Sequence, residues 1–158
     1  MIELFRVDDR LIHGQITTHW ITHINANEIY VIDDETAKDD FLTMVLKGLA
    51  PSRVKVFILK MEDSVNVLKE AEIEQKSNAI VIAKVPEVFL YLKENGVEIN
   101  ELNVGEMGQR GERIIVYRNI ACTLEEIETL RILHNMGVEI YFQALPSHPK
   151  GKYSNIIK

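Results

Sequence analysis

AIVIAKVPEVFLYLKENG, residues 79–96, contains a strand-sized apolar run followed by a helix-length amphipathic stretch. The run Ala79–Ala83 is apolar at consecutive positions, which is typical of a strand covered on both faces of a parallel sheet. Pro86 suits the first position of the helix, and Gly96 ends that helix before the next strand. A buried strand joined to a helix is the repeating unit of βαβ folds, so this stretch predicts an α/β protein.

The same alternation of short apolar runs and longer amphipathic stretches covers the whole chain. Further strands are expected at Ile2–Val7, Glu28–Ile32, Val54–Leu59, Leu102–Val104, Arg113–Tyr117 and Val138–Phe142. Further helices are expected at Gly14–Ile24, Thr36–Leu49, Glu62–Glu72 and Thr123–Met136. No linker or internal repeat interrupts the pattern. We therefore expect one domain over residues 1–158, an open, mostly parallel α/β sheet of about seven strands with helices on both faces.

Composition excludes several classes of function. The 158 residues include 18 Lys and Arg against 24 Asp and Glu, a net charge of −6, which argues against a nucleic-acid partner. Cys122 is the single cysteine, so an internal disulfide and a cysteine-based zinc site are excluded. No apolar run is long enough to span a bilayer, and MIELFRVDDR does not resemble a signal peptide. We expect a cytoplasmic protein without direct membrane insertion.

Ligands of open α/β sheets bind at the carboxyl ends of the strands, so the segment after the first strand is of particular interest. That segment contains Arg10, His13 and Gly14. The glycine allows close backbone approach, and the helix that begins there directs free N–H groups toward an anion. Arg10 offers a planar set of donors that suits phosphate oxygens. A histidine in this setting is suited to accept a phosphoryl group through a ring nitrogen.

Two aspartates precede the histidine, and either one could support it. Asp8 or Asp9 could orient the other ring nitrogen of His13 or hold Arg10. The alternative from the residues alone, a histidine that only caps or packs, stays open at this point. So does the role of Glu106, which follows Gly105 after the fifth predicted strand.

RVDDRLIHGQ, Arg6 to Gln15, resembles the active-site loop of the IIB component of the mannose/fructose/sorbose family of the bacterial phosphotransferase system. The resemblance extends over essentially the whole chain. IYVIDDETAKDDF (29–41) resembles the second-strand segment of that family, NVGEMG (103–108) its fifth-strand loop, and GVEIYFQALP (137–146) its closing strand. Family loops usually carry two glycines where this chain has Gly105-Glu106, and a carboxylate there is expected to repel a phosphoryl group.

The resemblance implies a phosphocarrier without a cofactor or metal, working through a covalent phosphohistidine. His13 is then the phosphorylated residue, through the ring nitrogen nearer the backbone, and Arg10 matches the phosphate-contacting arginine. Phosphate-binding or supporting roles fall on the surrounding loop residues Arg6, Asp8, Asp9, Gly14 and Gln15. Because both partners must reach His13, we expect its loop to be exposed.

The resemblance also implies partners. The IIA component donates the phosphoryl group, and a sugar in the IIC and IID membrane permease receives it, which places the chain at the cytoplasmic side of that permease. A homodimer is one alternative for the oligomeric state. Two other functions remain in view: a regulatory binding module with the same fold, and a small α/β enzyme that acts on a phosphorylated metabolite.

Other candidate residues have plainer interpretations. His19 and His23 share a helical face and could grip a metal, but no third ligand is evident, so a solvated face is favoured. Asp33 and Asp34 resemble the paired carboxylates of receiver domains, but the aspartate and lysine that such a site also needs are absent after the third and fifth strands. We expect Asp33 and Asp34 to be structural. Trp20 and Phe41 are expected in the core.

Overall fold

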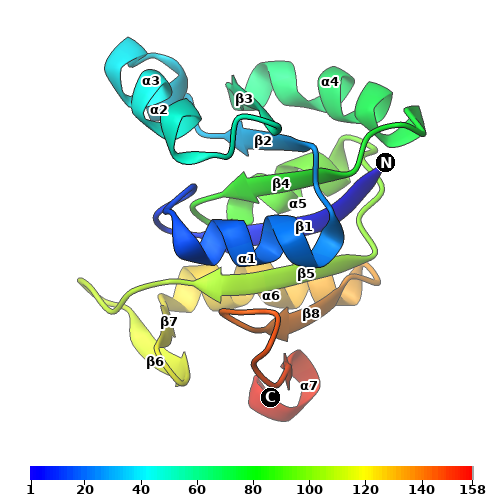
Figure 1. Cartoon of the computed structure of the whole chain (residues 1–158). Helices are drawn as coiled ribbons and strands as arrows, with labels where there is room; N and C mark the ends of the chain where they lie inside the picture. The colour runs from blue at the N-terminus through cyan, green and yellow to red at the C-terminus, as the bar shows by residue number, and fades with distance from the viewer. Residues whose placement is uncertain (158) are drawn as a thin grey trace.

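The computed structural model describes residues 1–157, apart from the side chain of Ile16, and contains a seven-stranded sheet covered on both faces (Figure 1). The strand order is β3-β2-β4-β1-β5-β8-β9, and the pairs are parallel except for β8 with β9. The strands of this sheet are β1 (Ile2–Asp8), β2 (Glu28–Ile32), β3 (Lys55–Leu59), β4 (Ala79–Ala83), β5 (Glu101–Glu106), β8 (Glu139–Phe142) and β9 (Gly151–Lys152). The predicted mostly parallel α/β sheet is confirmed.

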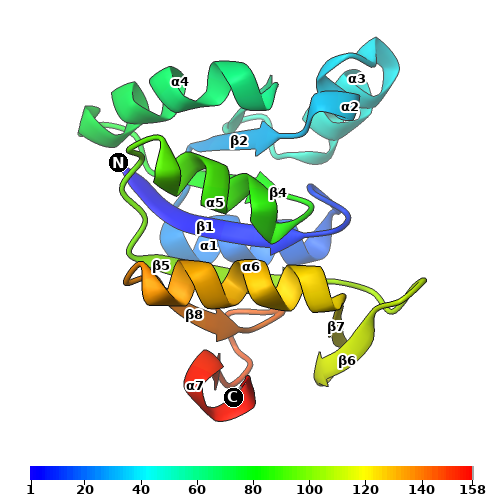
Figure 2. The same ribbon diagram turned by 180° about the vertical axis from the view of Figure 1, so that it is seen from behind.

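The helices divide between the two faces and produce two hydrophobic clusters. They are α1 (Gln15–Ile24), α2 (Asp34–Ala37), α3 (Asp40–Leu49), α4 (Met61–Ile73), α5 (Pro86–Glu94), α6 (Leu124–Asn135) and α7 (Tyr153–Ile156). On one face α4, α5 and α6 bury Leu68, Phe89 and Leu130 against the sheet (Figure 2). On the other face α1 buries Trp20 and Ile21 (Figure 1). Because both faces are covered, β4 is buried at every position, as the run of consecutive apolar residues predicted.

Local contacts fix several of the helix boundaries and core positions. Thr123 and Glu126 form the capping box that begins α6, with each side chain accepting a hydrogen bond from the other residue's backbone N–H. Pro86 is the first residue of α5, and Gly96 follows that helix with φ 90°. Trp20 is buried, and its Nε1 donates to the carbonyl oxygen of Ala144 at 2.9 Å.

Three expectations need correction. The strand predicted at Arg113–Tyr117 is β6 (Ile114–Tyr117), which pairs with β7 (Ile120–Cys122) in a separate antiparallel hairpin, and the seventh strand of the main sheet is β9. The helix predicted at Thr36–Leu49 is two helices, because the Asp39 side chain accepts from Leu42 N–H and begins a new helix there. Phe41 is 66% exposed and lies outside the core.

None of the helices formed by residues 1–157 combines the length and the apolar character that crossing a bilayer requires.

Candidate functional site

The candidate site lies where two carboxyl-terminal loops diverge. β1 and β5 are neighbours in the sheet, and the chain leaves β1 toward α1 on one face and β5 toward the hairpin and α6 on the other (Figures 1 and 2). Such a divergence is a topological switch point, where open α/β sheets form their crevice. His13 follows β1 and Glu106 ends β5, so both side chains enter this crevice.

The loop after β1 is held by its own backbone and by two apolar anchors. Leu11 N–H donates to Asp8 O at 3.0 Å, and His13 N–H donates to the Thr17 hydroxyl at 3.0 Å. Leu11 and Ile12 are 3% and 1% exposed, packed into the α1-side cluster. Leu11 adopts φ 58°, a left-handed conformation that leucine rarely accepts. The loop is therefore a specific, tightly held structure.

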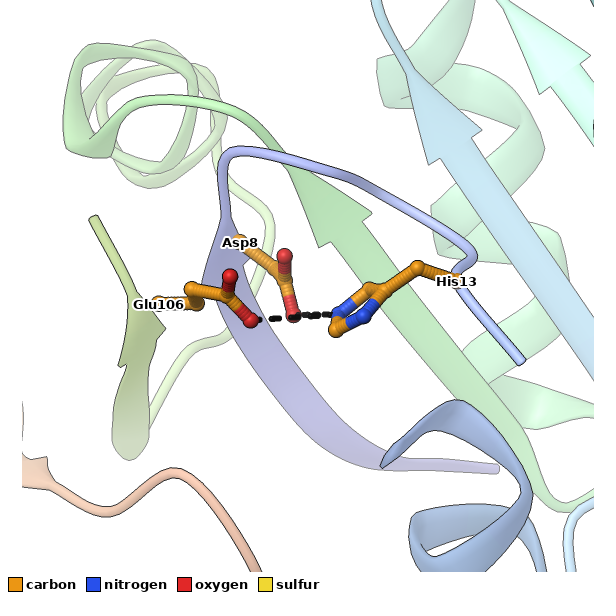
Figure 3. Close-up of side chains that lie close together, drawn as sticks. All are labelled: Asp8, His13 and Glu106. Carbon is orange, nitrogen blue, oxygen red and sulfur yellow. Dashed lines mark hydrogen bonds and ion pairs between the residues drawn. The ribbon is translucent and has the colours of Figure 1, made fainter. Parts of the chain in front are cut away.

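Asp8 fixes the imidazole of His13. The ring Nε2 lies 2.7 Å from Asp8 Oδ2, with only 5% of the histidine side chain exposed (Figure 3). Because a carboxylate only accepts hydrogen bonds, the neutral ring carries its proton on Nε2 and its lone pair on Nδ1. Nδ1 is buried and has no hydrogen-bond partner among residues 1–157. Of the two aspartates that the sequence offered to orient the ring, Asp8 is the one that contacts it.

The expected exposure of the His13 loop holds at Arg10, but the imidazole itself is buried. The loop lies at the carboxyl-terminal end of the central strand β1, and the ring points inward toward Asp8 and Glu106 (Figure 3). The cause is the pairing with Asp8, which is 1% exposed at the end of β1 and draws the ring down onto the strand.

Arg6, two residues before Asp8 on β1, holds the Asp8 carboxylate in place through hydrogen bonds and does not contact the His13 loop. Its Nε and Nη2 donate to Asp8 Oδ2 at 3.2 and 3.1 Å, while Nη1 donates to Asn103 Oδ1 at 2.5 Å and to the carbonyl oxygen of Gln143 at 3.1 Å. Burial lowers the pKa of Arg6, and the neighbouring Asp8 carboxylate opposes that effect. Because these groups occupy the guanidinium, Arg6 supports the site and does not bind phosphate in this arrangement.

Asp9 does not contact the His13 ring and instead binds the loop after β5. Its carboxylate accepts from Arg113 Nη1 at 2.8 Å and from Gly108 N–H at 2.6 Å. Arg113 in turn donates to Glu126, the capping-box glutamate of α6, through two bonds of 3.1 Å. This network joins the β1 loop to the loop after β5. Sequence reasoning missed the role of Arg113 in this network because Asp9 lies 104 residues away in the chain.

Arg10 and Glu106 form the outer side of the site. The Arg10 guanidinium is 61% exposed and lies 3.8 Å from Glu106 Oε1, while Glu106 Oε2 lies 3.5 Å from His13 Nε2. Arg10 therefore pairs with a carboxylate and does not contact His13. Glu106, expected to repel a phosphoryl group, contacts the histidine and the arginine at once.

Gly14 and Gln15 lie at the start of α1. Gly14 is the residue before the helix, with φ 73° and ψ −119°, a conformation that favours glycine. Among the described residues no side chain caps this helix, and its first turn contains no acidic residue. Gln15 is exposed. The backbone N–H groups of the first turn are thus left available to an anion.

A divalent cation has a geometric opportunity in the cluster of Asp8, His13 and Glu106, whose ligand atoms lie within 4.8 Å of one another. Two arginines oppose it: Arg6 bonds the same Asp8 oxygen, and Arg10 pairs with Glu106. The two guanidinium charges already balance the two carboxylates, so a cation would bring uncompensated charge. His19 and His23 lie on the exposed face of α1, as expected.

The other nucleophile and the nearby cavity do not offer competing chemistry. Burial raises the pKa of the Cys122 thiol to about 12, so it stays protonated. A cavity of about 640 Å³ lies beside Glu106, between the β6–β7 hairpin and the loop after β8. His13 does not line it. An enzyme that used His13 as a base on a ligand in this cavity would lack the required contact.

Comparison with known proteins identifies the family of the chain. Residues 2–158 match the family model described as the PTS system sorbose subfamily IIB component. The chain belongs to this family of phosphotransferase-system IIB components. It is 30% identical over 149 residues to the sorbose-specific EIIB component of Lacticaseibacillus casei, covering 94% of this chain and 90% of that protein.

Two further relatives of this IIB component are informative. The IIBSor domain of the sorbose permease from Klebsiella pneumoniae has 30% identity and a TM-score of 0.89, covering 96% of this chain and 93% of that one. The mannose-specific EIIAB component of Escherichia coli K12 is 29% identical over 157 residues, which are 99% of this chain and 48% of that protein. The IIB fold is thus found both as a separate chain and as part of a longer one.

The packing around Arg6 predicts that one glycine of the IIB component tolerates no side chain. A Cβ at Gly105 would overlap the Arg6 guanidinium, whereas a Cβ at Gly108 would have only Asp9 Oδ2 nearby, at 3.7 Å. Gly105→Ala should lower the free energy of unfolding by about 1–3 kcal/mol, as overpacking of a buried site does. Gly108→Ala is the matched control and should unfold like the wild type in urea. Equal stability of all three proteins would contradict the close packing of Arg6.

Proposed function

We propose that this IIB component is a phosphocarrier that accepts a phosphoryl group on His13 from a phosphorylated IIA component. It then passes the group to a sugar in a IIC/IID membrane permease. The observation that carries the proposal is the pairing of His13 Nε2 with Asp8, which leaves Nδ1 as a lone-pair nitrogen with no hydrogen-bond partner in the described part of the chain. A nucleophilic histidine needs this tautomer.

The residues around His13 divide the chemical work. Nδ1 attacks phosphorus, the bond from phosphorus to the donor breaks, and positive charge develops on the ring. Asp8, 2.7 Å from Nε2, stabilises that charge without taking the proton. The uncapped N-terminus of α1 and Arg10 supply donors to the phosphoryl oxygens. Transfer between the two histidines is close to isoenergetic, because both donor and product are N–P compounds. No metal or cofactor is needed if Arg10 and the α1 amides supply enough charge stabilisation.

Because Nδ1 is buried, transfer requires a change in the loop. Gly14 adopts a backbone conformation that favours glycine, and Leu11 has a positive φ, so both are positions where the backbone can relax into another state. The Arg10–Glu106 pair is the exposed part of the closed arrangement. In the phosphorylated state Arg10 exchanges the Glu106 carboxylate for the phosphoryl group, and Nδ1 becomes accessible while Nε2 keeps its hydrogen bond to Asp8.

The proposed partners follow from the family. The name of the mannose-specific EIIAB relative joins an A and a B component, which supports a IIA donor for this chain. The acceptor sugar reaches the carrier through the permease, so the protein works in the cytoplasm, peripheral to the membrane. A carrier that must leave each partner after transfer needs modest interfaces and weak affinity.

Phosphoryl labelling tests the proposed function. The protein is mixed with labelled phosphoenolpyruvate, the general phosphotransferase proteins and a sorbose-family IIA component. We expect acid-labile label on the wild type and none on His13→Ala, because acid hydrolyses phosphohistidine. His19→Ala is the matched control and should label like the wild type. An unlabelled wild type would contradict the proposal and favour a regulatory binding module. A labelled His13→Ala variant would show that another residue accepts the phosphoryl group.

Removing the arginine should slow transfer. In Arg10→Ala the phosphoryl oxygens lose one charged donor, and we expect the rate of labelling from IIA to fall by about tenfold or more. The guanidinium is 61% exposed, so circular dichroism and thermal unfolding should match those of the wild type. A variant that labels normally would show that Arg10 pairs only with Glu106.

Removing the negative charge of Glu106 should have the opposite effect. In Glu106→Gln the phosphoryl group enters without a carboxylate 3.5 Å from the ring, so the labelling rate should rise by about two- to tenfold. Glu101→Gln, on the exposed amino end of the same strand, is the matched control and should leave the rate unchanged. A slower Glu106→Gln variant would mean that Glu106 aids the transfer.

A further inference from the structure

Helix α3 is the least covered helix of the sheet region. It projects at one end of the molecule, beyond β2 and β3, and none of its ten residues is buried (Figures 1 and 2). Only Thr43 and Leu46 are half-buried, and they attach the helix to the rest of the protein. Its large exposed apolar residues are Phe41 (66%), Leu42 (41%), Met44 (63%), Val45 (41%) and Leu49 (44%).

Four of the exposed residues form one stripe along the helix, and Leu42 and Leu49 lie beside it. Phe41, Met44, Val45 and Gly48 are spaced i, i+3, i+4 and i+7, the spacing of a helix–helix seam. Thr43 and Leu46, which attach the helix, face the other way. Around Gly48 a Cβ would find no atom within 4 Å, so the surface is open at that end of the stripe. A large side chain from another helix can rest there.

The charged residues beside the stripe are complementary to those on a second, antiparallel copy of the same helix. Asp40 in the first turn and Lys47 in the last turn are seven residues apart, so they flank the same side of the stripe. When two such helices run antiparallel, each aspartate meets the lysine of the other helix. The helix dipoles also oppose, which is the favourable arrangement.

We propose that α3 of one molecule packs antiparallel against α3 of a second copy, about a twofold axis that passes between Met44 and Val45. In this arrangement Phe41 of each copy lies over Gly48 of the other, and Asp40 pairs with Lys47. A twofold interface uses the same patch on both subunits, so it requires this self-complementarity. The acidic residues that precede the stripe, Asp39 and Asp40, disfavour an anionic lipid surface as the occupant.

The proposed dimer uses none of the residues assigned to phosphoryl transfer. His13 follows β1 in the middle of the strand order, whereas α3 connects the two strands at the β3 end. A ten-residue helix is about 15 Å long, so the paired helices bury less than the roughly 800 Å² per partner of a standard interface. The association is therefore weak and depends on concentration.

Sedimentation of the full chain over a concentration series tests the dimer. The wild type should shift from monomer toward dimer as the concentration approaches about 1 mM. Phe41→Ser removes the largest apolar contact and should weaken dimerisation by about tenfold or more. Ile73→Ser is the matched control, since Ile73 is 79% exposed on α4, and it should dimerise like the wild type. Circular dichroism verifies that each variant is folded.

Mixing two charge variants distinguishes a second copy from any other occupant. Asp40→Lys puts two lysines on each helix, and Lys47→Asp puts two aspartates there, so each variant alone should dimerise about two- to fivefold more weakly than the wild type. Their mixture should form the mixed dimer more tightly than either variant pairs with itself. A wild type that stays monomeric throughout the series, or a mixture no better than its parts, would overturn the proposal.

Discussion

The site depends on the burial of one guanidinium. Arg6 is 2% exposed in the middle of the sheet, and burial lowers its pKa, so it needs a carboxylate nearby to remain charged at low cost. Asp8 supplies that charge two residues later on the same face of β1, since alternate residues of a strand share a face. Asn103 and the Gln143 carbonyl use the remaining donors of Arg6. Gly105 is required because any larger residue would enter the same space.

The Arg6–Asp8 pair helps to explain how a histidine in an acidic protein can accept a negatively charged phosphoryl group. The net charge of −6 describes the whole chain, but exposed charges further apart than roughly 8 Å are largely screened. Around His13 the order is local: Arg6 compensates Asp8, and Arg10 lies beside Glu106. Glu106 is the residue of this arrangement that can move most easily, because it is partly exposed and its ion pairs with Arg10 and His13 are long. The proposed entry of a phosphoryl group therefore needs movement of Glu106 and Arg10 rather than of the buried pair.

Much of the fold could be predicted from the sequence, because runs of consecutive apolar residues with helix caps between them occur in few architectures. The run Ile114–Tyr117 has the composition of a strand, but composition does not specify a pairing partner, and the segment forms a hairpin outside the sheet. Asp39 was a visible capping signal within a stretch assigned to one helix. The apolar character of Phe41 predicted burial, yet no element formed by residues 1–157 covers Phe41 on α3.

The part of the site formed by residues close together in the sequence could be predicted. The loop that contains Arg10, His13 and Gly14 follows from its position after the first strand and from its residue types. The supporting contacts from Arg113 to Asp9 and from Arg6 to Asn103 join segments about a hundred residues apart, which periodicity cannot relate. The inward direction of the His13 ring also needed the structure, because it depends on which residues surround Asp8.

The position of the phosphoryl group on the ring tests the central claim most directly. The protein is labelled with ¹⁵N at histidine, phosphorylated, and examined by ¹⁵N and ³¹P nuclear magnetic resonance. If Asp8 holds the Nε2 proton, the phosphorus should couple to Nδ1 of His13, and Nε2 should remain protonated. Coupling to Nε2 would contradict the account, because that nitrogen would then have to abandon Asp8 before it could react.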